Sequence, residues 1–242
     1  MAISDAQGLP LTRQRFIDLV LSLSPRIAAF DCDGTLWSGD AGEGFFDWEI
    51  GTGLVAPEIG RAMRARYVEY KLGRVSEDDM CARMVTMHKG LSEAAMMEAA
   101  AEFMTAAFAG EAFDEMLELV ERLRAQGCDI WAVSSSNEWV IRAGAQQFGI
   151  PENRILAAKA EVENGFVTDR LVAMPSGPGK PRALRQVLRD QSLDAAFGNS
   201  RWDTEMLSLA ERAFAINPNP DLEITARERG WTIYFPDGTA RQ

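Results

Sequence analysis

The chain alternates between short apolar runs and longer stretches in which apolar residues recur at helical spacing. Short apolar runs are typical of buried strands, whereas the helical spacing predicts amphipathic helices. The strand-like runs are 26–30, 129–133, 195–197, 213–216 and 231–235. Helical patterns lie between most of them, at 114–125, 138–148, 181–189 and 204–211. We therefore predict an α/β protein with a parallel sheet covered on both faces, in which ligands bind beyond the carboxyl ends of the strands.

Two segments interrupt this alternation. Residues 38–110 contain many Met and Ala residues, mostly at helical spacings, and no strand-like run. This pattern favours a helical insertion with a methionine-rich core over a functional methionine surface, and we interpret it as a cap over the site. Residues 155–172 hold two partly alternating runs on either side of Asn164-Gly165, which predicts a β-hairpin.

Composition narrows the classes of function. The net charge is −11 and the pI is about 4.7. Such an acidic surface repels a phosphate backbone, so we expect no nucleic-acid partner. A small anion can still bind a locally positive site. The apolar stretch 16–23 is short and predicts an amphipathic helix, not a signal peptide or a membrane span. The three cysteines lack a metal-binding spacing and predict reduced thiols in a cytoplasmic protein. The single histidine, His88, excludes a mechanism that needs two.

The first chemical signal is the pair Asp31 and Asp33, which follows the first predicted strand in the run FDCDGTLW. Asp31 should point into the crevice at the carboxyl edge of the sheet, and Gly34 frees the backbone of the loop. A Mg²⁺ ion would let the two carboxylates coexist, because it prefers hard oxygen ligands. Asp31 is then a candidate in-line nucleophile on phosphorus, and Asp33 a candidate general acid and base. The alternative is an Asx-type turn with solvated carboxylates.

A run of serines follows the second core strand. Ser134 comes directly after the predicted strand, and Ser135, Ser136 and Asn137 lead into a helix that begins near Glu138. A serine hydroxyl together with the free N–H groups of a helix N-terminus forms an anion site. The alternative is a plain N-cap by Ser136 or Asn137, and both can hold at once, with Ser134 facing the ligand.

Two later signals complete the set. Lys180 lies just before a helix in which we expect Pro181 to be the first residue, and a lysine there opposes the helix dipole unless an anion lies between them. In the loop GNSRWD after the run 195–197, Asn199 offers a neutral oxygen to a cation. Asp203 can hold a metal-bound water or Lys180, and the alternative is a turn with Asp203 near the N-terminus of the next helix.

The order of these signals resembles the haloacid dehalogenase superfamily. Its pattern is D-x-D-G-T after strand one, Ser or Thr after the next core strand, Lys before a helix, then G-D/N-x-x-x-D. The helical insertion after the first motif is similar to the phosphoserine phosphatase-like branch, and the cap matches least well. The resemblance implies a Rossmann-like, doubly wound parallel sheet with an inserted small helical cap domain and a β-hairpin. The implied division is a catalytic core of residues 1–37 and 111–242 and a cap of residues 38–110.

The resemblance also implies a role for each motif residue. Asp31 attacks the phosphoryl group and forms an aspartyl-phosphate, while Asp33 protonates the leaving oxygen and then activates water. Mg²⁺ is held by the Asp31 carboxylate, the Asp33 carbonyl and the side chain of Asn199, where an Asn in place of the commoner Asp should weaken metal binding. The residues implied around the phosphate are Ser134, Ser135, Lys180 and Gly34, with Asp203 behind them. A carboxylate at Asp33 favours phosphate esters over halides, because a leaving halide needs no proton.

The cap should contact the leaving group, and the sequence offers two patterns for it. Asp40 and Glu43 lie about where phosphoserine phosphatases hold a cap glutamate, and Arg83 lies near their arginine in a register that does not align cleanly. Alternatively, the aromatic residues around these acids, Trp37 and Trp48 among them, form a cage for a cationic head group. Packing of the same aromatic residues at the hinge between cap and core is the alternative, and we favour it over the cage.

We therefore expect a Mg²⁺-dependent phosphoric monoester hydrolase that acts on a small phosphorylated metabolite. The candidate substrates are phosphoserine-like esters and amino-alcohol phosphates such as phosphocholine. A phosphotransferase or mutase would keep the same motifs. A non-catalytic phospholigand-binding protein is the third class, and the presence of Asp31, Asp33 and Lys180 argues against it. We expect no membrane partner, and no pattern in the sequence sets the oligomeric state.

Overall fold

A seven-stranded sheet forms the centre of the protein in the computed structural model, which describes residues 11–237 and residue 239. The strand order is β4-β3-β2-β1-β5-β6-β7, and neighbouring strands are parallel except for the antiparallel pair β3 and β4. The strands are β1 (Ile27–Phe30), β2 (Asp129–Asn137), β3 (Ile155–Glu163), β4 (Phe166–Ala173), β5 (Ala195–Gly198), β6 (Arg212–Ile216) and β7 (Thr232–Tyr234). All the predicted strands are present, and the α/β fold is confirmed.

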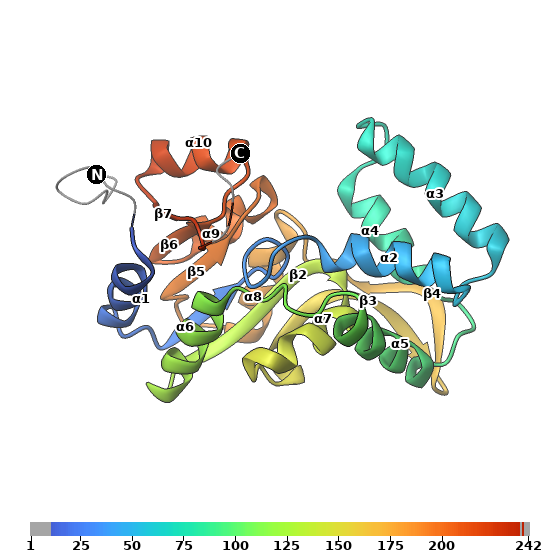
Figure 1. The fold of residues 1–242 in the computed structure, drawn as a ribbon, viewed down its shortest axis with the longest axis horizontal. Helices are drawn as coiled ribbons and strands as arrows, with labels where there is room; N and C mark the ends of the chain where they lie inside the picture. Colours follow the sequence, from blue (N-terminus) through green and yellow to red (C-terminus); the bar gives the residue numbers. More distant parts are fainter. Residues whose placement is uncertain (1–10, 238, 240–242) are drawn as a thin grey trace.

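Helices cover both faces of this sheet (Figure 1). They are α1 (Arg13–Ser22), α6 (Asp114–Ala125), α7 (Glu138–Ala145), α8 (Gly179–Leu188), α9 (Thr204–Leu209) and α10 (Pro220–Arg229). Alternate residues of a strand face opposite sides, and all of β1 is buried. Ala28 and Phe30 pack with α1, α6 and α7, whereas Ile27 and Ala29 pack with α8, α9 and α10. This arrangement is the doubly wound sheet that the resemblance implied.

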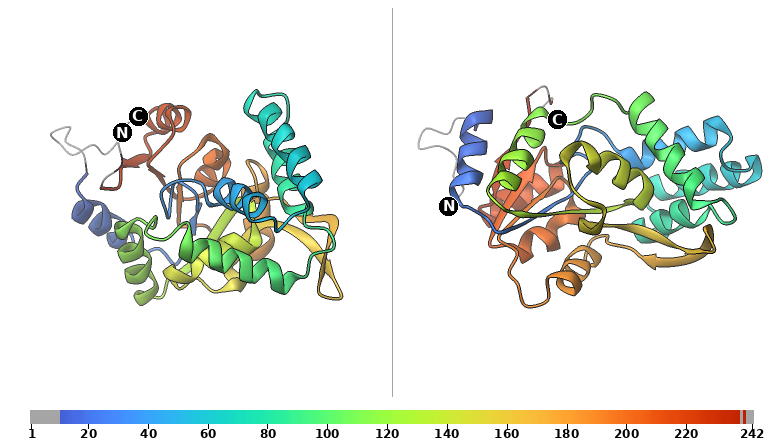
Figure 2. Two further views of the ribbon diagram at one scale, coloured as in Figure 1. Left: turned by 45° about the vertical axis from the view of Figure 1, so that its right-hand side comes forward. Right: turned by 90° about the horizontal axis from the view of Figure 1, so that it is seen from below.

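The helices inserted between β1 and α6 stand at one end of the sheet, beside the β3-β4 hairpin (Figure 2). They are α2 (Ala41–Thr52), α3 (Pro57–Lys71), α4 (Glu77–Thr86) and α5 (Glu93–Ala106). Their own apolar cluster includes Met63, Met80 and Met87, so these methionines fill a helical core. Helix α5 packs on α7, and α4 packs on β2 and on the hairpin. The insertion therefore lies close to the carboxyl ends of the central strands.

Local chemistry explains the hairpin and several element ends. Strands β3 and β4 pair on either side of Asn164-Gly165, whose φ angles of 53° and 81° suit the tight turn of a two-residue loop. The helix expected at 181–189 begins earlier, because Gly179 and Lys180 already donate to the carbonyls of Ser176 and Gly177. Pro181 therefore lies inside the first turn, which corrects its predicted place at the first position. No helix in the described part of the chain is long and apolar enough to cross a membrane.

Candidate active site

The loop after β1 places the paired aspartates. The main-chain N–H groups of residues 35–37 all donate to the carbonyl oxygen of Cys32 (2.8–3.4 Å), so the chain turns sharply there. Gly34 lies inside the turn with a φ of 73°, a left-handed conformation that favours glycine. The turn holds Asp31 and Asp33 at the carboxyl edge of the sheet, as the strand pattern predicted.

A buried ion cluster joins three of the candidate residues. Nζ of Lys180 lies 2.6 Å from Oδ1 of Asp31 and 2.5 Å from Oδ1 of Asp203, and Lys180 is only 2% exposed. Burial and the charge of Asp203 raise the pKa of Asp31 to about 7, although Lys180 lowers it. Burial alone would lower the pKa of Lys180, but the two carboxylates outweigh it and hold that pKa above its usual value. The anions beside this lysine are therefore carboxylates of the protein itself.

Asp203 is held by the loop that follows β5. Its Oδ2 accepts hydrogen bonds from the main-chain N–H groups of Asn199 (3.0 Å) and Ser200 (2.9 Å) and from the Ser200 hydroxyl (3.2 Å). Gly198 permits this close approach, because a Cβ at that position would lie 2.5 Å from Cβ of Asp203. Of the roles that the sequence left open for Asp203, two are observed together: Asp203 contacts Lys180, and it ends a turn directly before the first residue of α9.

Asp33 is enclosed by three hydrogen-bond donors. Its Oδ1 accepts from the indole N–H of Trp37 (2.8 Å) and from the main-chain N–H of Ala41 (2.6 Å), the first residue of α2. Its Oδ2 accepts from the hydroxyl of Ser136 (2.7 Å). Burial and the charge of Asp40 raise the pKa of Asp33 to about 7. The contact from Ser136 was not predicted, because three consecutive serines give no sign of which one faces Asp33.

The last residues of β2 serve two purposes: they cap the next helix and they line a cavity. Strand β2 continues to Asn137 through an irregular register, and the Asn137 side chain caps α7 by accepting from the N–H of Val140 (3.0 Å). The hydroxyl oxygen of Ser134 accepts from the N–H of Ser136 (3.1 Å), and Ser134 is buried. Ser134 and Ser135 both line the cavity described next. An N-cap and a cavity-facing serine therefore coexist, with Asn137 as the cap.

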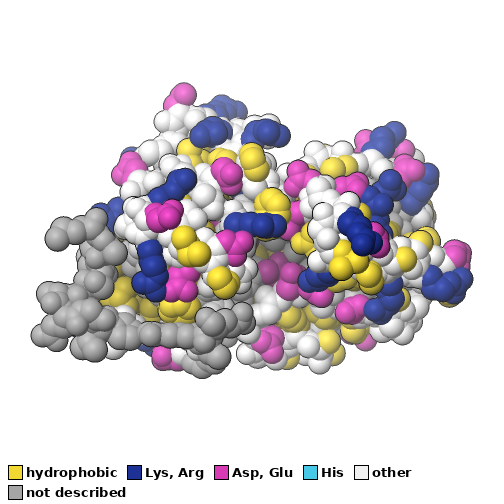
Figure 3. Space-filling view, turned by 90° about the horizontal axis from the view of Figure 1, so that it is seen from above, with side chains coloured by type: hydrophobic (Ala, Val, Ile, Leu, Met, Phe, Trp, Pro, Cys, Tyr) yellow, Lys and Arg dark blue, Asp and Glu magenta, His cyan; other side chains and the backbone are white. Residues whose placement is uncertain are grey.

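The candidate residues surround a cavity of about 440 Å³ between the strand ends and the inserted helices. Figure 3 shows acidic side chains gathered in the hollow between the two halves of the molecule. From the core, the lining includes Asp31, Asp33, Gly34, Ser134, Ser135, Lys180 and Asn199. From the inserted helices, it includes Asp40, Glu43, Tyr67, Tyr70, Lys71 and Glu77. The sequence pointed to the acids near the first motif but missed the contributions of α3 and α4.

Three of the predicted cap residues lie away from this cavity, which corrects their expected place beside the leaving group. The ring of Trp37 is buried among aromatic side chains, and its N–H points to Asp33. Trp48 stacks on Phe45, with ring centres 5.9 Å apart, and Arg83 is exposed. None of the three lines the cavity. The geometry therefore favours aromatic packing over an aromatic cage built from Trp37 and Trp48.

The residues expected to hold Mg²⁺, which are Asp31, Asp33 and Asn199, all line this cavity. The side chain of Asn199 lies against the loop of the first motif, since a Cβ on Gly34 would come within 1.9 Å of its Nδ2. A half-turn of the amide exchanges its nitrogen and oxygen, so the oxygen can face the same point. Together with the carboxylate of Asp31 and the carbonyl of Asp33, it offers hard oxygen ligands that suit Mg²⁺. Within residues 11–237 and 239, no three His, Cys, Asp or Glu side chains gather as a metal site.

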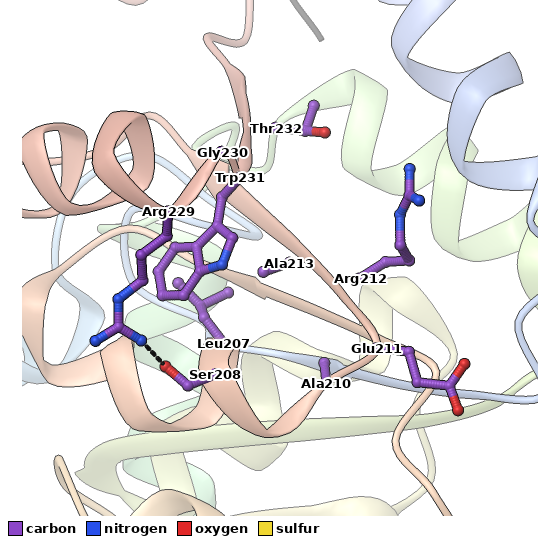
Figure 4. Close-up of a pocket in the computed structure, with 10 residues that line it drawn as sticks. All are labelled: Leu207, Ser208, Ala210, Glu211, Arg212, Ala213, Arg229, Gly230, Trp231 and Thr232. Atoms are coloured by element: carbon purple, nitrogen blue, oxygen red, sulfur yellow. Dashed lines mark hydrogen bonds between the residues drawn. The ribbon is translucent and has the colours of Figure 1, made fainter. Parts of the chain in front are cut away.

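A second cavity, of about 400 Å³, lies at the opposite ends of β6 and β7. Figure 4 shows Arg229 reaching Ser208, at 2.6 Å between Nη1 and Oγ, with the ring of Trp231 close by. Among the described residues that line it, Glu211 is the one acidic residue and none is a lysine. The paired carboxylates and the buried lysine belong to the first cavity, which is therefore the candidate active site.

The fold and this site define a Rossmann-like α/β protein with an aspartate pair at the carboxyl edge of its sheet, and the chain belongs to the haloacid dehalogenase-like hydrolase family. The family match spans residues 28–208, from β1 through α9. The predicted superfamily is thus confirmed, and the chain is an enzyme.

Several known proteins are similar to this chain. The phosphoserine phosphatase SerB1 of Mycobacterium tuberculosis is 29% identical over 235 residues, covering 91% of this chain and 72% of its own. The histidinol-phosphatase of Neisseria meningitidis is 27% identical over 217 residues, covering 86% of this chain and 97% of its own. A solved structure of a protein with unknown function from Bordetella pertussis Tohama I superposes with a TM-score of 0.78 at 24% identity, covering 87% and 98% of the two chains. The family and its phosphatase-named members support a phosphatase of the phosphoserine phosphatase-like branch.

Proposed function

We propose that this protein hydrolyses a phosphate monoester of a small metabolite, with Mg²⁺, through an aspartyl-phosphate on Asp31. The observation that carries the proposal is the ammonium of Lys180 between Asp31 and Asp203 at the base of the cavity. A buried cation in a cavity that is otherwise rich in carboxylates is suited to the charge of a phosphoryl group. The phosphatase-named relatives support the same reaction.

Asp31 is the proposed nucleophile, and two contacts fix its orientation. Thr35 donates its hydroxyl to Oδ2 (3.0 Å) and Lys180 donates to Oδ1 (2.6 Å). Fixed alignment of this kind and stabilisation of charge are the main requirements of phosphoryl transfer. The hydroxyl of Ser134, in the same lining, would hold a phosphoryl oxygen, whereas that of Ser135 already donates to Glu77 (3.4 Å). When bound, Mg²⁺ supplies further neutralisation of the phosphoryl charge.

Asp33 is the proposed general acid and base, and its hydrogen bonds indicate which oxygen carries the proton. The N–H groups of Trp37 and Ala41 can only donate, so Oδ1 must remain an acceptor. The hydroxyl of Ser136 can either donate or accept, so Oδ2 is free to hold a proton. Since the pKa of Asp33 is raised to about 7, the group can both give and take a proton near neutral pH.

Hydrolysis of p-nitrophenyl phosphate tests the proposal directly. We expect turnover with Mg²⁺, its loss in EDTA and its recovery when Mg²⁺ is added back. Asp31→Asn should abolish turnover because the amide is a poor nucleophile, whereas Asp169→Asn, an exposed aspartate on β4, should leave it intact. No turnover at any Mg²⁺ concentration, or full activity in Asp31→Asn, would contradict the proposal.

The proposed substrate is a small phosphorylated metabolite of the cytoplasm. The three cysteines are all unpaired in the structure, which is typical of a reducing compartment. Phosphoserine-like esters and amino-alcohol phosphates are the candidate groups. Release of one inorganic phosphate for each ester consumed would separate a hydrolase from a phosphotransferase, which would pass the phosphoryl group to another acceptor.

A further inference from the structure

We propose that the leaving group of the substrate carries a cationic amine and no carboxylate, and that Glu77 of α4 binds this amine. The inference rests on the proposed function and deepens it, because it concerns the leaving-group side of the same cavity. Glu77 is not part of any motif, and it enters the site only because α4 packs on β2.

The charges on this side of the cavity are predominantly negative. The inserted helices contribute the carboxylates of Asp40, Glu43 and Glu77 and the single ammonium of Lys71 to the lining. Lys71 is already paired, with Nζ 3.1 Å from Oε2 of Glu43 and 4.9 Å from the ring centre of Tyr67. Its charge therefore offsets that of Glu43, and Asp40 and Glu77 remain to face the leaving group.

Glu77 is the buried member of this set. It is 9% exposed, and its carboxylate accepts from the hydroxyls of Tyr70 (2.9 Å) and Ser135 (3.4 Å). Both donors are neutral, and Glu77 forms no ion pair among the residues that the structure describes. A buried carboxylate outside any ion pair is costly: burial raises the pKa of Glu77, although the hydroxyls of Tyr70 and Ser135 and the more distant charge of Lys180 lower it. A cationic amine at this point would complete an ion pair with Glu77 and gain two hydrogen-bond acceptors.

The position of Glu77 also sets the distance from the phosphate. Ser135, which touches Glu77, is the neighbour of the cavity-facing Ser134 at the end of β2. An amine held by Glu77 therefore lies close to the phosphoryl group, as in an ester with a short aminoalkyl chain. Because the tyrosine hydroxyl of Tyr70 already donates to Glu77, the carboxylate is oriented before the ligand arrives.

A carboxylate on the leaving group would meet like charges here. Asp40 and Glu77 would face it, and juxtaposed like charges disfavour binding strongly. Arg83, the arginine that the sequence offered for such a carboxylate, is exposed and lies outside the lining. To neutralise the carboxylate of the leaving group, Lys71 would have to give up its ion pair with Glu43. We therefore expect phosphoserine to be a poor substrate, in contrast to the name of the mycobacterial relative.

Three esters isolate the two charges: phosphoethanolamine, ethyl phosphate and phosphoserine. Ethyl phosphate lacks the amine, and phosphoserine adds a carboxylate to the amine. We expect kcat/KM to be highest for phosphoethanolamine. It should exceed kcat/KM for ethyl phosphate by about tenfold or more, and it should exceed kcat/KM for phosphoserine by the same factor. In Glu77→Gln, which keeps the acceptor oxygen for Tyr70, the ratio of phosphoethanolamine to ethyl phosphate should fall about tenfold. Glu69→Gln, an exposed glutamate of α3 outside the lining, should leave that ratio unchanged.

The outcomes separate this inference from the proposed function. If p-nitrophenyl phosphate is hydrolysed but kcat/KM for phosphoserine equals that for phosphoethanolamine, the inference is wrong and the phosphatase activity stands. The same holds if Glu77→Gln keeps the wild-type ratio. If neither p-nitrophenyl phosphate nor any of the three esters is hydrolysed, both the function and the inference fall.

Discussion

Replacing Lys180 by methionine removes the cation at the centre of the site while keeping most of the side-chain volume. Asp31 and Asp203 would then face each other in the interior without the ammonium that each contacts at about 2.6 Å or less. Removing one partner of a buried ion pair costs about 3–5 kcal/mol, because the remaining charge is left uncompensated. For a protein of this size, each kcal/mol lowers Tm by about 2–4 °C. The expected drop in Tm is therefore about 6–20 °C.

The structure offers a control pair with the same ion-pair distance in an exposed environment. Lys89 lies 2.5 Å from Asp169, the same distance as Lys180 from Asp203, but the Lys89 and Asp169 side chains are 65% and 59% exposed. An exposed pair contributes about 0–1 kcal/mol, so Lys89→Met should barely change Tm. Thermal unfolding of both variants, in EDTA to exclude metal effects, compares burial directly.

Adding Asp203→Asn to Lys180→Met tests the cause of the loss. The amide removes one of the two orphaned charges, and its oxygen can still accept from the N–H groups of Asn199 and Ser200. We expect Tm to recover in part, whereas turnover of p-nitrophenyl phosphate with Mg²⁺ stays lost. A Tm shift for Lys180→Met no larger than that for Lys89→Met, or full turnover without Lys180, would refute the reasoning.

Three other variants test the rest of the site. Ser136→Ala removes the hydroxyl that donates to Asp33, a hydrogen bond worth about 1.5–3 kcal/mol, so kcat should fall about 10–150-fold. The fall in kcat should be larger for ethyl phosphate than for p-nitrophenyl phosphate, whose leaving group needs less protonation. Equal losses of kcat for the two substrates would contradict the role of Asp33 as general acid. Gly34→Ala should lower Tm more than Gly73→Ala, although both glycines have a φ near 72°. The reason is that a Cβ at residue 34 would lie 1.9 Å from Nδ2 of Asn199, whereas a Cβ at residue 73 would meet no neighbour within 4 Å. Equal losses of Tm would mean that the contact with Asn199 is not restrictive. Asn199→Asp adds a charge beside the proposed metal ligands and should lower the half-saturating Mg²⁺ concentration several-fold; an unchanged Mg²⁺ titration of turnover would argue against Asn199 as a ligand.

The fold was predictable where local pattern and burial agree. Helix α6 has the predicted bounds, because Met116, Leu119, Val120 and Leu123 recur at helical spacing and form its buried face. The hairpin was predictable because Asn164 and Gly165 tolerate the positive φ angles that the turn requires. The start of α8 was not predictable, because it depends on hydrogen bonds to Ser176 and Gly177 in the preceding loop.

The site shows the same division between local and tertiary information. Asp31, Ser134 and Asn199 were predictable because parallel strands end at one edge, so residues that follow them converge. Glu77 could not be found in this way, because its place depends on how α4 docks on the sheet. The ring of Trp37 adjoins the motif in sequence, yet its N–H and its packing partners turn it away from the cavity.

The central claim is that Asp31 becomes phosphorylated, and trapping the phosphoenzyme tests it most directly. A substrate labelled in its phosphoryl group is mixed with the enzyme and Mg²⁺, quenched in acid during turnover, and the protein is digested. We predict a label that hydroxylamine removes, as for an acyl phosphate, on the peptide that contains Asp31, and no label in Asp31→Asn. A label that resists hydroxylamine on the peptide of Ser134, or turnover with no labelled protein at any quench time, would contradict the account.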